Sequence, residues 1–246
     1  MPGRDDQLSV FPAFFRVEGK EAVVVGNGDE ALAKVRLLLN TRARIALVAD
    51  APEAALVALV AQNNIRHVGR PFDGGHLDGA TLVFAATGNA AEDRAIVGAA
   101  RVRHIPANAV DQPDYCDFYT PAIVNRAPVA VAIGTEGAGP VLSQMIRAQV
   151  DQLLSPSLGR LARLATLYRD AVEHVLPRGV TRRVFWRRFF SGSVADAVNA
   201  GQFDDAEREA ARLLNTMERI EGHVWLVGAG PGSEDLLTLR AQRAMM

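Results

Sequence analysis

Short apolar runs alternate with segments of helical periodicity through the first part of the chain, and this alternation restricts the fold more than any other feature. Runs of the strand type occupy residues 22–25, 45–48, 65–68, 81–86 and 105–110. Between them, helical spacing of apolar residues predicts helices at 30–40, 52–62 and 90–102, the second with Pro52 in its first turn. Because strands that alternate with helices form right-handed crossover units, the sequence predicts an α/β fold with a doubly wound parallel sheet.

The pattern changes after Asp111. Two further strands are expected at 118–124 and 129–133, joined by residues 125–128 and followed by a helix over 141–154. Beyond Pro156, helical periodicity predicts helices at 158–176, 181–190, 194–199 and 204–220. A last strand-like run, 224–227, then meets a glycine-rich segment. We therefore expect the chain to divide into segments 1–113, 114–150, 151–221 and 222–246.

The composition favours a globular protein without a general polyanion-binding surface. Hydrophobic residues make up 49% of the chain, which is enough for a substantial core. The 27 basic and 28 acidic residues give a net charge of −1, which argues against a nucleic-acid or membrane-surface partner. No apolar run approaches the ~18 residues of a membrane span, and the first residues lack the apolar stretch of a secretory signal. A cytoplasmic protein is expected.

Residues that commonly bind metal ions are sparse. Cys116 is the single cysteine, so neither an internal disulfide nor a thiolate metal cage is expected. The five histidines are scattered, and no two of them stand at the i, i+3 or i, i+4 spacing of a helical metal site. We therefore expect no metal site built by the protein.

The first motif with a chemical meaning is Gly26-x-Gly28-x-x-Ala31, which follows the first predicted strand and opens the first predicted helix. Its glycines permit a tight turn and a close approach of the backbone to a pyrophosphate, which the amino terminus of the helix then binds. The alternative for this motif alone is an ordinary strand–turn–helix. In its context, the motif predicts a nucleotide-binding turn.

An acidic residue follows the second predicted strand at the distance typical of dinucleotide-binding proteins. Asp50 stands about 20 residues after the glycine turn, where a carboxylate binds a ribose 2′-hydroxyl. This favours NAD over NADP. Arg42 and Arg44 lie close to Asp50 in the sequence, and an arginine near this position accommodates the 2′-phosphate of NADP instead.

Polar residues follow two other predicted strands. Thr87 comes directly after residues 81–86, and Asn108 and Asp111 stand at the end of the run 105–110. Ligands of doubly wound sheets bind beyond the carboxyl ends of the strands, so Thr87 is expected near the nicotinamide end of the cofactor or in a simple turn. A carboxylate at position 111 can accept a proton as a hydride leaves, although a solvated loop aspartate has the same local pattern.

Two more segments of the sequence can each be interpreted in two ways. The glycine-rich loop 134–140 either binds an anion or forms a tight corner, and the loop alone favours the corner. Residues 182–190 interleave arginine and aromatic residues, which is typical of a single-stranded nucleic-acid binder. The reading we favour is an amphipathic helix with its aromatic residues inward and its arginines outward.

Taken together, these residues resemble the precorrin-2 dehydrogenase and sirohydrochlorin ferrochelatase module of the siroheme synthase family. The resemblance runs from about residue 11 to residue 220 and rests on an ordered set of short motifs. These are 24–29, Lys34-x-Arg36-Leu37-Leu38-Leu39, 71–72, 85–87, Asn108-x-Val110-Asp111, 121–123, 140–142 and Arg183-x-Phe185-Trp186. Residues 227–232 with 236–239 resemble the start of the family's uroporphyrinogen-III methyltransferase domain.

The resemblance implies a Rossmann-like NAD-binding domain, a small α+β dimerisation region at about 115–150 and an all-helical region. The implied reaction is transfer of a hydride from precorrin-2 to NAD⁺, giving sirohydrochlorin, followed by insertion of Fe²⁺, a substrate, to give siroheme. Asp111 is the implied catalytic residue, as general base in the oxidation and in the removal of pyrrole protons. A tetrapyrrole substrate and a second copy of the chain, in a homodimer with shared sites, are the implied partners.

The resemblance assigns roles to further residues. Those implied for cofactor binding are Gly26, Gly28, Asp29, Glu30, Asp50, Ala51 and Thr87, and those implied for the substrate loop are Asn108, Thr135 and Gly137. Pro231 matches a contact of S-adenosylmethionine, a cofactor expected only in the full-length protein, so methyl transfer is not expected of the 246-residue chain itself. Glu136 departs from the family pattern and puts a negative charge near the site of an acidic substrate.

Three alternatives are weighed against this interpretation. A short-chain dehydrogenase is excluded, because no lysine stands four residues after Tyr115, Tyr119 or Tyr168. An NAD-binding regulatory module of a tetrapyrrole enzyme, without its own catalysis, stays open because of Glu136. A nucleic-acid binder that uses residues 182–190 is the least favoured.

Overall fold

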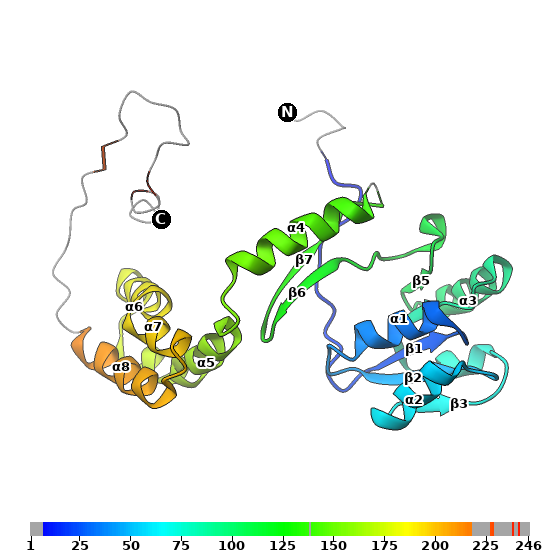
Figure 1. The fold of residues 1–246 in the computed structure, drawn as a ribbon, viewed down its shortest axis with the longest axis horizontal. Helices are drawn as coiled ribbons and strands as arrows, with labels where there is room; N and C mark the ends of the chain where they lie inside the picture. The colour runs from blue at the N-terminus through cyan, green and yellow to red at the C-terminus, as the bar shows by residue number, and fades with distance from the viewer. Residues whose placement is uncertain (1–6, 138, 218–226, 229–237, 239–240, 242–246) are drawn as a thin grey trace. The chain divides into compact units, whose positions relative to one another are not determined.

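The computed structural model describes residues 7–137, 139–217, 227, 228, 238 and 241, and Figure 1 shows its ribbon. The chain divides into two compact units between Leu154 and Ser155. The first unit holds a parallel sheet and a small hairpin with a helix, and the second is helical. No helix among the described residues is long and apolar enough to cross a membrane.

A five-stranded parallel sheet forms the centre of the first unit. Its strands are β1 (Glu21–Val25), β2 (Arg44–Val48), β3 (Arg66–Val68), β4 (Ala80–Ala85) and β5 (Ala107–Ala109), in the order β3-β2-β1-β4-β5. The connecting helices are α1 (Asp29–Leu38), α2 (Ala54–Gln62) and α3 (Ala90–Val102). The strand order reverses direction between β1 and β4, so the predicted doubly wound sheet is confirmed.

The continuous apolar runs of the sequence are explained by cover on both faces of the sheet. Val24 packs in one cluster with residues of α1 and α2, whereas Val23 packs in another with residues of α3. Both valines are fully buried. Because successive side chains of a strand point to opposite faces, a strand covered on both sides needs apolar residues at every position.

Several predicted boundaries are wrong by a few residues. The second helix begins at Ala54 after Glu53, so Pro52 lies outside its first turn. The strand expected from residue 118 begins at Ala122. The ring of Phe118 instead lies 5.4 Å, between centroids, from that of Phe84 in the sheet. Short 3₁₀ helices at Gly74–Leu77 and Pro113–Tyr115 are additions that the sequence did not predict.

A hairpin and one helix complete the first unit. Strands β6 (Ala122–Arg126) and β7 (Val129–Ile133) pair antiparallel, and the loop 134–139 leads into α4 (Pro140–Leu153). Arg126 fixes the hairpin to the end of α4: its Nη2 forms an ion pair of 2.9 Å with Asp151 and also donates to the carbonyl of Leu154. The predicted second strand and helix are thus confirmed, whereas the first strand begins four residues later than expected.

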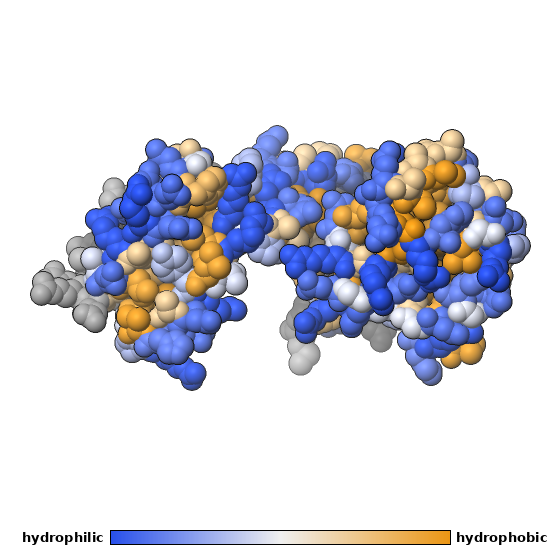
Figure 2. Space-filling model, turned by 90° about the horizontal axis from the view of Figure 1, so that it is seen from below, coloured by the Kyte–Doolittle hydropathy of each residue, from blue (hydrophilic) through white to orange (hydrophobic). Residues whose placement is uncertain are grey.

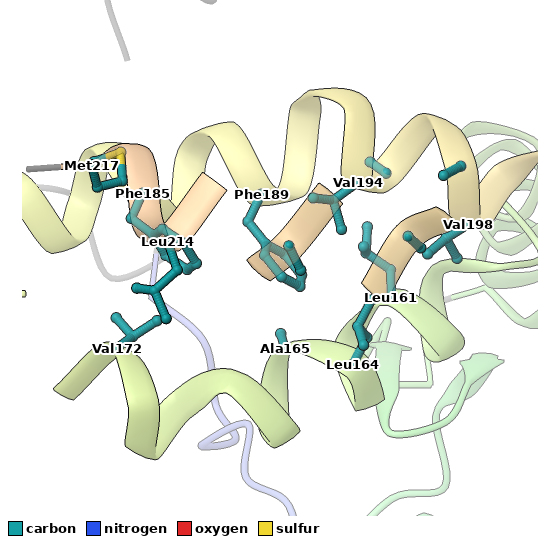
Figure 3. Close-up of a cluster of buried hydrophobic side chains, with 14 of the residues drawn as sticks. Leu161, Leu164, Ala165, Val172, Phe185, Phe189, Val194, Val198, Leu214 and Met217 are labelled. Carbon is teal, nitrogen blue, oxygen red and sulfur yellow. The ribbon is translucent and has the colours of Figure 1, made fainter. Parts of the chain in front are cut away.

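In its described part up to residue 217, the second unit is a bundle of four helices: α5 (Leu158–Val175), α6 (Val180–Ser191), α7 (Ser193–Asn199) and α8 (Phe203–Thr216). Figure 3 shows their shared core, in which Phe185 and Phe189 of α6 are fully buried. Arg187 and Arg188 are exposed, as the amphipathic reading predicts, but Phe190 is exposed as well. The expected strand at 224–227 and Pro231 lie outside the described residues, apart from Val227.

Candidate functional site

The turn after β1 has the shape that the glycine motif predicts. Gly26 has φ +148°, and a Cβ atom built on it would overlap the carbonyl oxygen of Ala86. Gly28 precedes the first residue of α1, and no side chain caps that end of the helix. The turn therefore brings its backbone close to β4 and leaves the amino terminus of α1 open, as a pyrophosphate site requires.

Asp50 lies at the carboxyl edge of the sheet, beside this turn. Its Oδ1 accepts a hydrogen bond of 3.1 Å from Nδ2 of Asn27, which holds the carboxylate next to the glycine turn. Asp50 and Ala51 are exposed, and Oδ1 of Asn27 is buried without a hydrogen-bond partner. A buried, unpartnered amide oxygen is costly, so it marks a position where a ligand donor is expected.

The two arginines near Asp50 in the sequence are not near it in space. Arg44 begins β2 and Asp50 follows the end of that strand, so the strand, about 13 Å long, separates them. Arg42 forms an ion pair of 2.7 Å with Glu18. The reading in which Arg42 or Arg44 accommodates the 2′-phosphate of NADP is therefore wrong on geometry.

Strands β1, β4 and β5 end in register. Val25 pairs with Ala85, and Ala85 pairs with Ala109, so the residues that follow each strand meet at one edge. Thr87 and Asp111 lie there, beyond β4 and β5 respectively. Asp111 is exposed and has φ +56°, a conformation that aspartate tolerates better than most residues. Thr87 and Asp111 thus lie at the edge where the sequence places them, and their roles there stay predictions.

The hydroxyl of Thr87 is engaged inside the protein. It donates to Oδ1 of Asp93 on α3, with the two oxygens 2.8 Å apart, and the backbone N–H of Thr87 donates to the same atom. Asp93 is only 2% exposed. The sequence did not single out Asp93. Its position three and four residues before Ile96 and Val97, on the buried face of α3, is the signal that would have found it.

Glu30 and Lys34 lie one turn apart on α1, and both interact electrostatically with Asp111 at this edge. Burial, followed by the charges of Asp111 and Asp93, raises the pKa of Glu30. Burial lowers the pKa of Lys34, and the charges of Asp111, Cys116 and Glu30 act in the opposite direction. The sequence named Lys34 only as part of a motif and missed it as a site residue. Its spacing with Ala31 and Leu38, both buried, was the available signal.

Asn108 and Cys116 form a polar cluster under the edge. Nδ2 of Asn108 donates to the carbonyl of Phe118 at 2.9 Å and to Sγ of Cys116 at 3.2 Å, and its Oδ1 is buried without a partner. Sγ of Cys116 contacts the carbonyl of Ala109, and burial raises the pKa of the thiol. Asn108 therefore anchors the loop after Asp111 through its amide nitrogen.

The predicted substrate loop has its own contacts. Oγ1 of Thr135 donates to the carbonyl of Gly139, and Gly137 has φ +82° and is exposed. The carboxylate of Glu136 accepts hydrogen bonds from the backbone N–H and the hydroxyl of Ser9, which lower its pKa. Within residues 7–137 and 139–217, no hydrogen bond joins Thr135 or Gly137 to the edge that holds Asp111.

No group of three or more histidine, cysteine, aspartate or glutamate residues in the described part of the chain is arranged to hold a metal ion.

In the helical unit, the guanidinium of Arg182 donates to the carbonyls of Leu176 and Glu173. Arg182 therefore caps the end of α5, whereas Arg183 and Arg187 are exposed.

The sheet, the glycine turn and the acidic residue after β2 define the chain's first unit as an NAD(P)-binding α/β domain. The family described as "Putative NAD(P)-binding" matches residues 13–122. The family described as "Sirohaem synthase dimerisation region" matches residues 157–214. These residues are the four-helix unit, not the segment 114–150 in which we expected the dimerisation region.

Individual relatives agree with both matches. The siroheme synthase of Methylobacillus flagellatus is 38% identical over 239 residues, which cover 97% of this chain and 51% of the relative. That of Pseudomonas aeruginosa is 40% identical over 240 residues, covering 97% and 52%. The chain is similar to siroheme synthases over nearly its whole length, and it spans about half the length of these curated relatives.

A solved structure has a similar fold. It is a precorrin-2 dehydrogenase with a TM-score of 0.68, and the match covers 84% of this chain and 99% of that chain. At 18% sequence identity, this likeness concerns the fold.

Proposed function

We propose that this chain carries out the NAD-dependent oxidation of precorrin-2 to sirohydrochlorin in siroheme biosynthesis. The observation that carries the proposal is the position of Asp111. Its carboxylate follows β5 at the same edge of the sheet as the glycine turn after β1. A general base beside a dinucleotide site is the arrangement that removal of a hydride and a proton requires. The kinship with siroheme synthases supports tetrapyrrole chemistry.

The residues of the turn fit NAD. The backbone of Gly26 and Gly28 leaves room for the pyrophosphate, and Asp29 and Glu30 begin the helix whose amino terminus faces it. Asp50, with Ala51 beside it, is available to the ribose hydroxyls, and the unpartnered Oδ1 of Asn27 can accept from one of them. When bound, NAD⁺ supplies the hydride acceptor.

The chain's own part in the reaction is proton transfer and positioning. Oxidation of precorrin-2 to sirohydrochlorin removes two electrons and two protons, as one hydride and one proton. The carboxylate of Asp111 accepts the proton, and the residue is exposed on a turn with positive φ. Thr87, held by Asp93, shapes the turn after β4 on which the nicotinamide end of the site is built.

We also propose that the chain inserts Fe²⁺ into sirohydrochlorin. In this step two pyrrole N–H protons leave and the four nitrogens of the macrocycle become iron ligands. Asp111 is the candidate acceptor of these protons, since it already faces the macrocycle in the oxidation. Asn108, Thr135 and Gly137 are the candidate substrate-loop residues. Glu136 accepts hydrogen bonds from Ser9, which favour its charged form.

A homodimer is part of the proposal. Helix α4 exposes four apolar side chains, Val141, Leu142, Met145 and Leu153, which a second copy of the chain would cover. Dimerisation through α4 and the β6–β7 hairpin would use segment 114–150. The four-helix unit 157–214 matches a family region named for dimerisation, so a dimer contact through that unit is the alternative.

Three further expectations stay predictions. Residues 222–246 are expected to start a methyltransferase domain that uses S-adenosylmethionine in the full-length protein. A cytoplasmic location without a nucleic-acid partner is expected.

An NAD-binding regulatory module without catalysis is the second candidate function, and the exposed Glu136 in the substrate loop is the observation that favours it.

The test is direct. The protein is mixed with precorrin-2 and NAD⁺, absorbance is followed for sirohydrochlorin and NADH, and Fe²⁺ is then added to detect siroheme. Asp111→Asn keeps the positive-φ turn and should bind NAD⁺ normally but oxidise precorrin-2 at least ~100-fold more slowly. The exposed Asp114, in the following 3₁₀ helix, is the matched control, and Asp114→Asn should keep the wild-type rate. Binding of NAD⁺ without any oxidation would favour the regulatory module.

A further inference from the structure

Arg94, on α3, is held in place by an aromatic ring. Its guanidinium carbon lies 5.5 Å from the centre of the Tyr115 ring, and both residues are exposed. Within residues 7–137 and 139–217, the side chain of Arg94 forms no ion pair and no hydrogen bond beside this contact. A cation–π contact restricts a guanidinium without using its N–H groups as donors. Arg94 therefore presents a set of unused donors at a fixed place.

The Arg94–Tyr115 pair flanks the loop that follows β5. The backbone N–H of Tyr115 donates to the carbonyl of Gln112 at 3.0 Å, and Gln112 is the residue directly after Asp111. Nε2 of Gln112 donates in turn to Oδ2 of Asp93, the neighbour of Arg94 on α3, at 3.3 Å. Arg94 is thus connected to the loop of Asp111 both through Tyr115 and through the start of α3.

The charges at this edge make an exposed cation necessary for an acidic substrate. Asp111 and Asp114 are both exposed there. Lys34 is half-buried, with its Nζ 3.4 Å from Oγ1 of Thr120. Precorrin-2 and sirohydrochlorin carry several carboxylates around the rim of the macrocycle, so exposed carboxylates alone would repel them. Arg94 supplies an exposed positive charge beside the same loop.

We propose that Arg94 binds a carboxylate of the tetrapyrrole substrate and holds the macrocycle at the edge that contains Asp111. The planar fork of a guanidinium matches both oxygens of a carboxylate, which a point charge cannot do. Tyr115 is the positioning residue that orients this fork. The inference rests on the proposed function for the identity of the substrate, but binding can be measured without NAD⁺ and without turnover.

Affinity for sirohydrochlorin, followed by the change in its absorbance on binding, is the first test. Arg94→Gln should weaken binding about tenfold, the scale of one charge-assisted hydrogen-bonded contact. Arg94→Lys keeps the charge without the fork and should have an intermediate affinity. Arg44→Gln removes an exposed arginine from the opposite edge of the sheet and should bind like the wild type. Equal affinities of the wild type and Arg94→Gln would overturn the inference.

The aromatic ring provides an independent test. Tyr115→Phe keeps the ring and should keep the affinity, whereas Tyr115→Leu should weaken sirohydrochlorin binding by about 2–5-fold, the scale of an exposed cation–π contact. If Tyr115 acts through Arg94, adding Tyr115→Leu to Arg94→Gln should cause no further loss. Circular dichroism verifies that each variant is folded. A full additional loss in the double variant would overturn the positioning role of Tyr115.

Steady-state kinetics separates this inference from the proposed function. Arg94→Gln should raise KM for precorrin-2 about tenfold and leave kcat within about twofold, because the contact is made equally before and during the reaction. A lower kcat at unchanged KM would overturn the inference. A protein that binds sirohydrochlorin through Arg94 but does not oxidise precorrin-2 would keep the inference and reject the reaction. A wild type that binds no sirohydrochlorin would reject both.

Discussion

Thr87 and Asp93 are joined twice through a single atom. Oδ1 of the buried Asp93 accepts a hydrogen bond of 3.0 Å from the backbone N–H of Thr87 and one of 2.8 Å from its hydroxyl. The other carboxylate oxygen, Oδ2, accepts from Nε2 of Gln112, beyond β5. One aspartate on α3 thus ties together the two turns, after β4 and after β5, between which the proposed chemistry takes place.

Asp93→Ala should therefore destabilise the first unit by about 1–2 kcal/mol, because it leaves the half-buried N–H of Thr87 without its acceptor. Thr87→Ser keeps both donors and is the matched control, with a loss below about 1 kcal/mol. Urea unfolding followed by circular dichroism measures both variants. Asp93→Ala with wild-type stability would mean that the turn finds another acceptor and that Asp93 does not organise it.

The turn at Gly26 gives a prediction about side-chain volume. Gly26→Ala should cost about 3 kcal/mol or more of unfolding free energy and abolish NAD⁺ binding, since the new Cβ would overlap the Ala86 carbonyl at a φ of +148°. Gly98→Ala is the contrasting variant, because a Cβ on that helical glycine of α3 meets nothing within 4 Å. It should gain about 0.5–1 kcal/mol. Thermal unfolding and calorimetric titration with NAD⁺ measure both effects, and normal NAD⁺ binding by Gly26→Ala would contradict the turn's proposed role.

The cofactor preference gives a third prediction. The Asp50 carboxylate, held by Asn27, should repel the 2′-phosphate of NADP⁺, so NAD⁺ should bind at least tenfold more tightly. Asp50→Asn should reduce this preference, mainly by improving NADP⁺ binding. Arg44→Gln, at the far end of β2, should change neither affinity. Equal affinities for the two cofactors in the wild type, measured by calorimetry, would reject this role of Asp50.

The sheet and the glycine turn could be predicted because their signals are local. A strand covered on both faces, such as β1, appears as a continuous apolar run, and a turn that tolerates no Cβ appears as Gly26. The start of β6 could not be predicted in this way. Phe118 is an aromatic residue of the kind favoured in strands, but its ring packs on Phe84 and Phe15, and the strand begins only after Pro121.

Of the charged residues at the site, Asp111 could be predicted from the sequence, whereas Lys34 and Asp93 could not. Asp111 stands beyond a strand, where loop residues meet a ligand, so its position alone suggests a role. Lys34 and Asp93 lie inside helices, where a charged residue is normally taken to be solvated. Both in fact stand at the spacing of buried residues, Ala31 and Leu38 for Lys34 and Ile96 and Val97 for Asp93. A charge on the apolar face of a helix is the pattern to look for in such sequences.

The raised pKa of Glu30 predicts how stability varies with pH. Because burial and the charges of Asp111 and Asp93 favour its neutral form, the folded state binds this proton more tightly than the unfolded state. The resulting stabilisation is fully present below the ordinary pKa of 4.5 and is lost as the pH rises through the folded-state pKa. Ionised Glu30 therefore destabilises the protein at neutral pH.

Glu30→Gln removes that charge and keeps an acceptor for the backbone of Gly88. It should make the protein more stable than wild type at pH 7, and the difference should shrink towards zero as the pH falls to 4.5. Asp29→Asn, on the exposed residue in the same first turn, controls for the loss of an acidic side chain from the helix amino terminus, which is destabilising by itself. Unfolding free energies at several pH values between 4 and 8 give the comparison. A Glu30→Gln variant that is less stable than wild type at pH 7, or that differs from it equally at every pH, would show that the neighbouring carboxylates do not act on this residue as its pKa indicates.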